Sequence, residues 1–228
     1  MANTIAVVGG SGTGKSTSIR NLDPKETAII NCAGKPLPFK GSAAMYNIAN
    51  KNFLTTSTSA EVLGALKEIA KNPQFKNVIV DDSLFIMTDM FFNRSAEKGY
   101  DKFTDIAKAY QSMLQYCKTM RDDLNIAIMM HVEDEVSNGI KVQQKVKTVG
   151  KLVDEKYDPL SVVSVALFTD VSFDKEGKAQ YQFVTNRQMV QGVVIPAKSP
   201  DGMFEEIRIP NDLKEVFRIS REYYNLNA

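Results

Sequence analysis

The chain has 228 residues, of which 43% are hydrophobic and 24% charged; ordinary folded proteins have similar values, which argue against global disorder or a fibrous design. The 28 Lys and Arg residues face 27 Asp and Glu, so the formal charge of +1 gives no whole-molecule attraction to nucleic acid. The length suits one α/β domain over residues 1–228 better than two small domains.

The composition also bears on the cellular compartment. Apolar runs such as 126–130 and 162–168 are far shorter than the ~20 residues that a membrane-spanning helix needs. The first residues lack the basic start of a secretory signal, and Cys32 and Cys117 show no disulfide or zinc pattern. We therefore expect a cytoplasmic protein, in the host cytoplasm if it is viral, with no membrane partner and with reduced cysteines.

The first half of the chain alternates predicted strands with predicted helices. Strand-like apolar runs occupy 5–8, 27–31, 53–56, 78–80 and 126–130, and helical patterns occupy 15–22, a segment from about 58, and one from 104. Strands that alternate with helices form right-handed parallel crossovers. We predict an α/β fold with a mostly parallel central sheet that helices flank on both faces.

Beyond about residue 160 the pattern changes to strand-like runs. The runs 161–170 and 179–185 are joined by a turn at 174–177, which predicts a C-terminal antiparallel extension of the sheet. Asn211 can cap a last helix, whose apolar residues Leu213, Val216 and Phe217 would pack on the sheet edge.

A phosphate-loop pattern lies directly after the first predicted strand. Gly9 is followed by four residues and then by Gly14, Lys15 and Ser16, which completes the pattern. Glycines allow the backbone amides to turn inward around phosphate oxygens, and the helix that follows would point its positive end at the same anion. We therefore expect ATP and Mg²⁺ to bind here. The predicted nucleotide-binding residues are Gly10, Ser11, Gly12, Thr13, Gly14, Lys15, Ser16, Thr17 and His131.

Two acidic residues at a strand end complete the predicted site. Lys15 can reach the β and γ phosphates, while the Ser16 hydroxyl can ligate Mg²⁺ and Asp81 can hold the same ion through water. Asp82 is one residue further on and could orient the attacking water as a general base. An equal alternative is that Asp82 caps the segment beginning at Ser83 and Leu84.

Two further residues follow the predicted strand 126–130. His131 is the only histidine, and its place at a strand tip favours a γ-phosphate sensor over a structural role. Glu133 is a rival for the water-positioning role, with a solvated acidic loop of Glu133, Asp134 and Glu135 as the alternative.

Together these motifs resemble those of small phage-encoded RecA-like ATPases, a family that includes single-strand-annealing proteins. The resemblance is carried by 9–16, Val78 to Asp82, His131 and Thr185 to Arg187. It implies a RecA-like P-loop NTPase fold, ATP hydrolysis, and single-stranded DNA as a partner in phage recombination, annealing or replication. It also implies a homo-oligomer in which Arg187 reaches the neighbouring subunit's nucleotide, although an ordinary surface arginine is an equal alternative.

The resemblance points to the loop 135–156 as a DNA contact, with Lys141, Lys145, Lys147 and Lys151 as phosphate ligands and a solvated charged loop as the alternative. The segment 93–103, in which cations alternate with aromatic residues, is a second candidate. RecA itself carries a catalytic Glu after its second strand, whereas this chain reads Asn31 to Lys35 with no acid. Two hypotheses therefore stay open: a DNA-stimulated ATPase, and a nucleotide-gated assembly protein that hydrolyses ATP slowly without DNA. A small-molecule kinase ranks behind both, because no arginine-rich lid is present.

Overall fold

The computed structural model describes residues 2–226, except for the side chains of residues 151, 154 and 155. The strands are β1 (Asn3–Gly9), β2 (Thr27–Asn31), β3 (Phe53–Thr55), β4 (Asn77–Asp81), β5 (Asn125–Ser137), β6 (Ile140–Val146), β7 (Val165–Phe173), β8 (Ala179–Val184), β9 (Gln188–Val190), β10 (Val193–Ile195) and β11 (Arg208–Pro210). The α-helices are α1 (Ser42–Met45), α2 (Ser59–Lys71), α3 (Leu84–Asn93), α4 (Asp101–Thr119), α5 (Lys151–Lys156) and α6 (Leu213–Tyr223), and the 3-10 helices are η1 (Ser16–Asn21) and η2 (Pro159–Val162).

The main sheet runs in the order β11-β8-β7-β1-β5-β4-β2-β3. All neighbours from β7 to β3 are parallel, whereas β8 and β11 add antiparallel strands at the other edge. The predicted α/β fold, with a mostly parallel sheet and a C-terminal antiparallel extension, is confirmed. β1 lies centrally, between β5 and β7, and this position brings the loop after β1 close to the ends of several strands.

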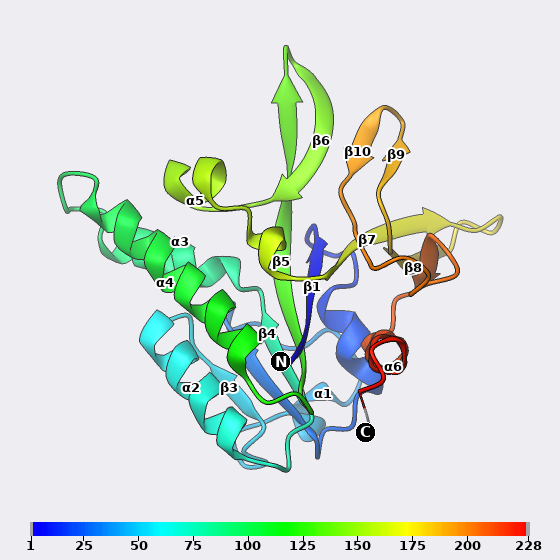
Figure 1. Ribbon diagram of the computed structural model, residues 1–228, viewed down its shortest axis with the longest axis horizontal. Coiled ribbons are helices and arrows are strands. Elements are labelled where there is room, and N and C mark those ends of the chain that lie inside the picture. Colours follow the sequence, from blue (N-terminus) through cyan, green and yellow to red (C-terminus); the bar gives the residue numbers. More distant parts are fainter. Residues whose placement is uncertain (1, 227–228) are drawn as a thin grey trace.

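Both faces of the sheet are covered, because successive side chains of a strand point to opposite faces. Ala6 and Val8 of β1 face a core shared with α2, α3 and α4. Ile5 and Val7 face a second core shared with η1 and α6. Figure 1 shows α2 and α4 on one side of the strands and α6 on the other.

The upper part of Figure 1 contains elements that the sequence did not predict. β5 continues past the buried residue Met130 to Ser137 and pairs with β6, so most of the expected loop 135–156 is a projecting hairpin followed by α5. β10 then pairs with β6 and β9. The prediction that the strand ends at His131 is wrong, since His131 lies inside β5.

Other boundaries also differ from the prediction. The helix expected over 15–22 is a six-residue 3-10 helix. The strand expected from residue 161 begins only at Val165, because η2 precedes it. Asp212, not Asn211, caps α6, and its side chain accepts a hydrogen bond from the backbone N–H of Lys214. The predicted turn is confirmed, with Asp174 accepting hydrogen bonds from the amides of Glu176 and Lys178.

Two composition-based predictions can also be compared with the structure. Cys32 and Cys117 are both buried and free, as expected. Burial raises the pKa of Cys117 to about 12, so this thiol stays protonated. Over residues 2–226, no helix combines the length and apolar character that crossing a membrane requires.

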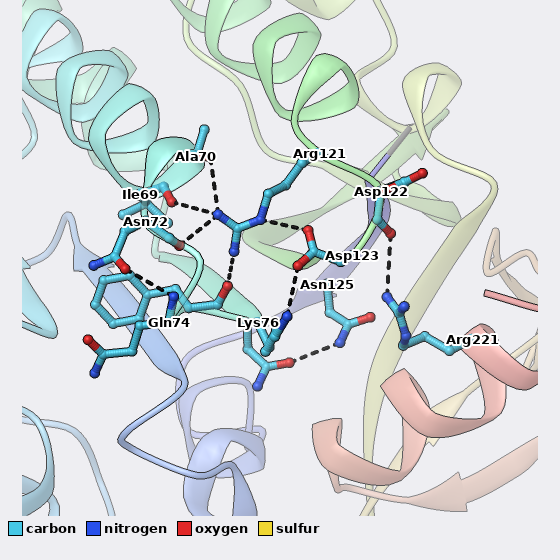
Figure 2. A network of polar contacts seen from close by, with 12 residues as sticks. Ile69, Ala70, Asn72, Gln74, Lys76, Arg121, Asp122, Asp123, Asn125 and Arg221 are labelled. Atoms are coloured by element: carbon cyan, nitrogen blue, oxygen red, sulfur yellow. Dashed lines mark hydrogen bonds and ion pairs between the residues drawn. The ribbon is translucent and has the colours of Figure 1, made fainter. Parts of the chain in front are cut away.

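A polar network ties the sheet to the helices at the edge remote from the β1 loop (Figure 2). The Arg121 guanidinium donates to the backbone carbonyls of Ile69, Ala70 and Asn72 at 3.3, 3.1 and 2.6 Å, and also to that of Phe75. These carbonyls belong to the end of α2 and the turn after it, where the regular helical hydrogen bonds stop and carbonyls need further donors. Arg121 also pairs with Asp123.

We expect Arg121→Ala to destabilise the fold by about 2 kcal/mol, because several carbonyls lose a charged donor. Chemical denaturation measures this change in the free energy of unfolding. The matched control is Arg218→Ala, which removes an arginine that pairs with two exposed acids of its own helix, Glu215 and Glu222. Equal losses in the two variants would contradict a special role for Arg121.

Candidate functional site

A cavity of about 410 Å³ lies at the carboxyl ends of β1, β2 and β4. Its size falls in the range of small-molecule sites, roughly 300 to 1,000 Å³. The cavity is lined by these residues predicted from the sequence: Gly10, Ser11, Gly12, Gly14, Lys15, Ser16, Thr17, Asp81, Asp82 and His131. The fold therefore brings together residues from three separate motifs.

The loop backbone explains why glycines occupy its fixed positions. Gly14 has φ +96°, a conformation that L side chains rarely adopt. Gly9 has a different constraint, since an added Cβ would lie 1.8 Å from Oγ1 of Thr169 and 2.8 Å from Oγ1 of Thr13. These two hydroxyls are hydrogen-bonded to each other at 2.6 Å. Thr13 thus points toward β7 rather than into the cavity.

We expect Gly9→Ala to destabilise the protein by about 2 kcal/mol, because a well-packed site must shift to admit the methyl group. Thermal unfolding of the purified variant measures the loss. The double variant Gly9→Ala/Thr169→Ala should recover part of it, since the hydroxyl in closest approach is removed. A Gly9→Ala protein as stable as the wild type would show that the contact with Thr169 is easily relieved.

Lys15 is a buried cation at the mouth of the loop, with 6% of its surface exposed. Its Nζ donates to the carbonyls of Gly9 and Gly10 at 3.0 and 2.9 Å and lies 3.9 Å from Asp82 Oδ1. Burial lowers its pKa, an effect that the nearby carboxylates of Asp82 and Asp81 oppose. The Lys15 ammonium group contacts carbonyl oxygens and only approaches a carboxylate, so it is well suited to bind an anionic ligand.

Ser16 and Asp81 meet across the cavity floor. The Ser16 hydroxyl donates to Asp81 Oδ1 at 2.9 Å, so the end of the β1 loop and the end of β4 are in direct contact. Burial, assisted by the charge of Asp82, raises the pKa of Asp81 to about 6. A cation placed beside this buried carboxylate would be strongly favoured.

Asp82 lies one residue beyond β4 and has φ +55°, which is uncommon for a non-glycine residue. Its Oδ1 lies 2.9 Å from His131 Nε2, although Nε2 has no well-aligned hydrogen bond within residues 2–226. Burial alone would raise the pKa of Asp82, but His131 and Lys15 outweigh burial and lower it. The carboxylate therefore stays ionised beside Lys15.

The capping alternative for Asp82 is not realised. The N-cap residue of α3 is Ser83, not Asp82, and no side chain makes a capping hydrogen bond there. Ser83 Oγ instead contacts the Tyr110 hydroxyl and the carbonyl of Met129. His131 reaches the same site because β5 runs parallel to β1, with His131 level with Gly9.

Three predicted site residues do not line the cavity: Thr13, which contacts Thr169 of β7, Glu133 and Arg187. Glu133 lies on the β5–β6 hairpin, where its Oε1 is 3.4 Å from Lys145 Nζ. Arg187 is exposed between β8 and β9, and its side chain has no hydrogen bond or ion pair with the described part of the chain. Of the two acids predicted for water positioning, Asp82 lines the cavity and Glu133 does not, and Arg187 does not line it either.

The cavity also contains residues that the sequence analysis did not assign to it. Asn31 and Lys35 come from the end of β2 and the loop after it, and Tyr181 comes from β8. Lys35 places its Nζ 5.6 Å from the centroid of the Phe85 ring, a cation–π distance. No sequence motif marks these residues, since only the order of the strands brings them to the loop.

The predicted DNA-contact segments are partly engaged within the chain. Lys141 pairs with Asp134 at 2.6 Å on the β5–β6 hairpin, and the side chain of Lys151 lies outside the described residues. In the segment 93–103, Arg94 pairs with Glu97 and Asp105. Lys102 donates to nearby carbonyls and lies over two phenylalanine rings.

Comparisons with known proteins give a limited result. No protein-family model matches the chain, and no curated protein sequence matches it. Among solved structures, a KaiC-like protein from the hyperthermophilic archaeon Pyrococcus horikoshii is similar over 85% of this chain and 88% of its own, at 9% identity and a TM-score of 0.49. At this level the similarity identifies neither a family nor an activity.

Proposed function

We propose that this chain is a Mg²⁺-dependent ATPase of the RecA-like P-loop class. The observation that carries the proposal is the contact between two separate motifs in one cavity. Ser16 of the loop is hydrogen-bonded to Asp81, and Lys15 faces Asp82, while glycine backbone surrounds the same space. Phosphate loops combine these groups around a nucleoside triphosphate.

The residues present fit a magnesium nucleotide. Among the side chains that the structure describes, no group of three or more His, Cys, Asp or Glu could hold a metal by itself. Mg²⁺ commonly relies on one or two protein oxygens, phosphate oxygens and water, and Ser16 and Asp81 supply such oxygens. When bound, the ion would neutralise charge on the β and γ phosphates.

The chain's own groups then divide the chemical work. Lys15 exchanges its contacts with the Gly9 and Gly10 carbonyls for phosphate oxygens, which keeps the buried ammonium paired. Asp82 orients a water molecule and accepts its proton as the water oxygen bonds to the γ phosphorus and the bond to the bridging oxygen breaks. His131 Nε2, which lies 2.9 Å from Asp82 Oδ1, can donate its N–H either to that carboxylate or to the terminal phosphate.

Two measurements test this proposal. Isothermal titration calorimetry should detect ATP binding that weakens when Mg²⁺ is removed by a chelator. Release of inorganic phosphate should then show turnover that also depends on Mg²⁺. Purified, folded protein that binds neither ATP nor GTP in the presence of Mg²⁺ would refute the proposal.

Action on single-stranded DNA, in phage recombination, annealing or replication, is the finer part of the proposal. It is supported by the β5–β6 hairpin, which projects from the sheet and carries Lys141, Lys145 and Lys147 (Figure 1). The test is retention of a single-stranded oligonucleotide at low salt and stimulation of turnover by it. In an oligomer formed on DNA, Arg187 would reach the neighbouring subunit's phosphates, so Arg187→Ala should reduce only the stimulated rate.

A nucleotide-gated assembly protein is the second candidate, and the same hairpin favours it. From Glu133 to Lys147 three lysines face three acids, so the hairpin has no excess positive charge. Val136 and Ile140 near its tip are 57% and 68% exposed, as suits a protein contact. ATP-dependent oligomerisation without any oligonucleotide retention would support this candidate over the DNA-stimulated ATPase.

A further inference from the structure

The amide side chain of Asn211 is buried against the phosphate loop without a hydrogen-bond partner. Asn211 is 2% exposed, and neither Oδ1 nor Nδ2 makes a hydrogen bond within residues 2–226. Its Nδ2 lies 3.1 Å from the position that a Cβ on Gly14 would occupy. Buried polar groups are seldom left unsatisfied, so a donor and an acceptor left together beside this loop point to a ligand. Both atoms are enclosed and Asn211 itself does not line the cavity, so a ligand reaches them when a neighbouring side chain moves.

An aromatic ring lies at the same place. Cδ1 of Tyr181 is 3.0 Å from the same Cβ position on Gly14, and Tyr181 lines the cavity. The residue is 45% exposed, so part of its ring is free to cover a flat ligand. A half-exposed aromatic ring and a buried amide are therefore neighbours at one edge of the loop.

Backbone contacts fix both residues to the loop. Asn211 follows β11, and its N–H donates to the carbonyl of Tyr181 at 3.3 Å. The Asn211 carbonyl accepts from Arg20 Nη1 at 2.7 Å, and the same nitrogen donates to the carbonyl of Thr17. Arg20 belongs to η1, which follows the loop directly, so the backbone of both residues is tied to the loop.

The order of the strands indicates which part of a nucleotide would lie here. β5 and β4, with His131 and Asp81, lie on one side of β1, whereas β7 and β8 lie on the other. A triphosphate whose terminal phosphate faces Asp82 runs along the loop away from β4. Its nucleoside then emerges on the side of β8, where Tyr181 and Asn211 are found.

We propose that Tyr181 and Asn211 form the nucleobase subsite and select adenine, an inference that rests on the proposed function. Tyr181 stacks on the purine, while Asn211 accepts a hydrogen bond from the adenine amino group and donates one to a ring nitrogen. An asparagine amide matches this adjacent donor and acceptor of adenine, whereas the corresponding edge of guanine presents two acceptors.

The test compares three probes with Mg²⁺ present: ATP, GTP and inorganic tripolyphosphate. We expect Tyr181→Ala and Asn211→Ala each to weaken ATP binding about tenfold, the scale of one stacking or one paired base edge, and to leave tripolyphosphate binding unchanged. Asn211→Ala should also reduce the preference for ATP over GTP. Tyr181→Phe should bind as the wild type does, because the ring is kept.

The matched control is Tyr100→Ala, which removes a tyrosine that is 85% exposed and remote from the loop, and it should change no affinity. Wild-type ATP affinity in both Tyr181→Ala and Asn211→Ala would overturn the subsite, as would an equal loss of ATP and tripolyphosphate binding. If Asn211→Ala fails to fold, the ATP and tripolyphosphate affinities of Tyr181→Ala decide whether the subsite exists, because a half-exposed side chain can be removed without loss of the fold. A wild type that binds tripolyphosphate but does not distinguish it from ATP overturns the subsite alone, whereas one that binds neither overturns the proposed function as well.

Discussion

Lys15→Ala is expected to weaken binding of Mg²⁺-ATP by at least about a hundredfold, since it removes charged hydrogen bonds worth roughly 3 kcal/mol or more in total. Lys15 is the buried cation of the cavity, and its ammonium group already lies among loop carbonyls and Asp82. Calorimetric titration of the variant measures the change in affinity, and phosphate release measures the accompanying loss of turnover.

The fold should survive this substitution. Burial lowers the pKa of Lys15, as expected for an ammonium group whose enclosure costs more free energy than its contacts return. The melting temperature of the ligand-free variant should therefore lie within a few degrees of the wild type. An unfolded Lys15→Ala protein would instead indicate a structural role for the lysine.

Lys35→Ala is the matched control for Lys15→Ala. Lys35 lines the same cavity but is exposed, and its ammonium lies against the Phe85 ring instead of the loop carbonyls. Its removal takes away the same formal charge and should lower ATP affinity less than tenfold, because an exposed charge is screened by water and salt. Equal losses in the two variants would mean that general positive charge, and not the Lys15 contact, holds the ligand.

The loop and the parallel sheet could be predicted from the sequence because their signals are local. The glycines, Lys15 and Ser16 are contiguous, and β1 precedes them as an uninterrupted apolar run. Asp81 could be placed because it ends β4, another buried strand. The carboxyl ends of parallel strands lie at the same edge of a sheet, so Asp81 was expected beside the loop. These predictions needed no knowledge of distant contacts.

The projecting hairpin was missed although the sequence carries a signal for it. Asn138-Gly139 is the dipeptide typical of a tight hairpin turn, and both residues have positive φ, at +51° and +78°. The lysines near this turn predicted a basic loop. The apolar residues Ile140, Val142 and Val146, which lie at even spacings as in a strand, were not used in that prediction. The Asn138-Gly139 turn, combined with these apolar positions, predicts the hairpin and the continuation of β5 beyond His131.

Tyr181 and Asn211 illustrate the part of the site that sequence could not provide. Asparagine is a common helix-capping residue, so the sequence predicted Asn211 as the cap of the last helix. The structure shows that Asp212 is the cap and that the Asn211 side chain packs beside Gly14. Both residues reach the loop because β8 runs antiparallel to β7, the neighbour of β1, and β11 in turn pairs antiparallel with β8. Such a contact depends on the order of strands, which no local pattern encodes.

Asp82→Asn is expected to reduce ATP turnover by at least about a hundredfold, the usual contribution of a general base, while ATP affinity changes only a few-fold. Asparagine has nearly the shape of aspartate and tolerates the left-handed conformation that Asp82 adopts at φ +55°, so the loop should be preserved. It cannot accept a proton from water. Single-turnover phosphate release, with affinity measured separately, distinguishes lost chemistry from lost binding.

Two further variants separate the carboxylate of Asp82 from its backbone. Asp82→Gly also removes the carboxylate but accepts positive φ without strain, so it should lose turnover to the same extent and remain folded. Glu133→Gln changes the rival acid, which pairs with Lys145 away from the cavity, and should leave turnover within about twofold, as surface changes do. A large loss in Glu133→Gln with an active Asp82→Asn would transfer the base role to the hairpin. That result would require the hairpin to fold over the bound nucleotide, because only then could the Glu133 carboxylate reach a water beside the terminal phosphate.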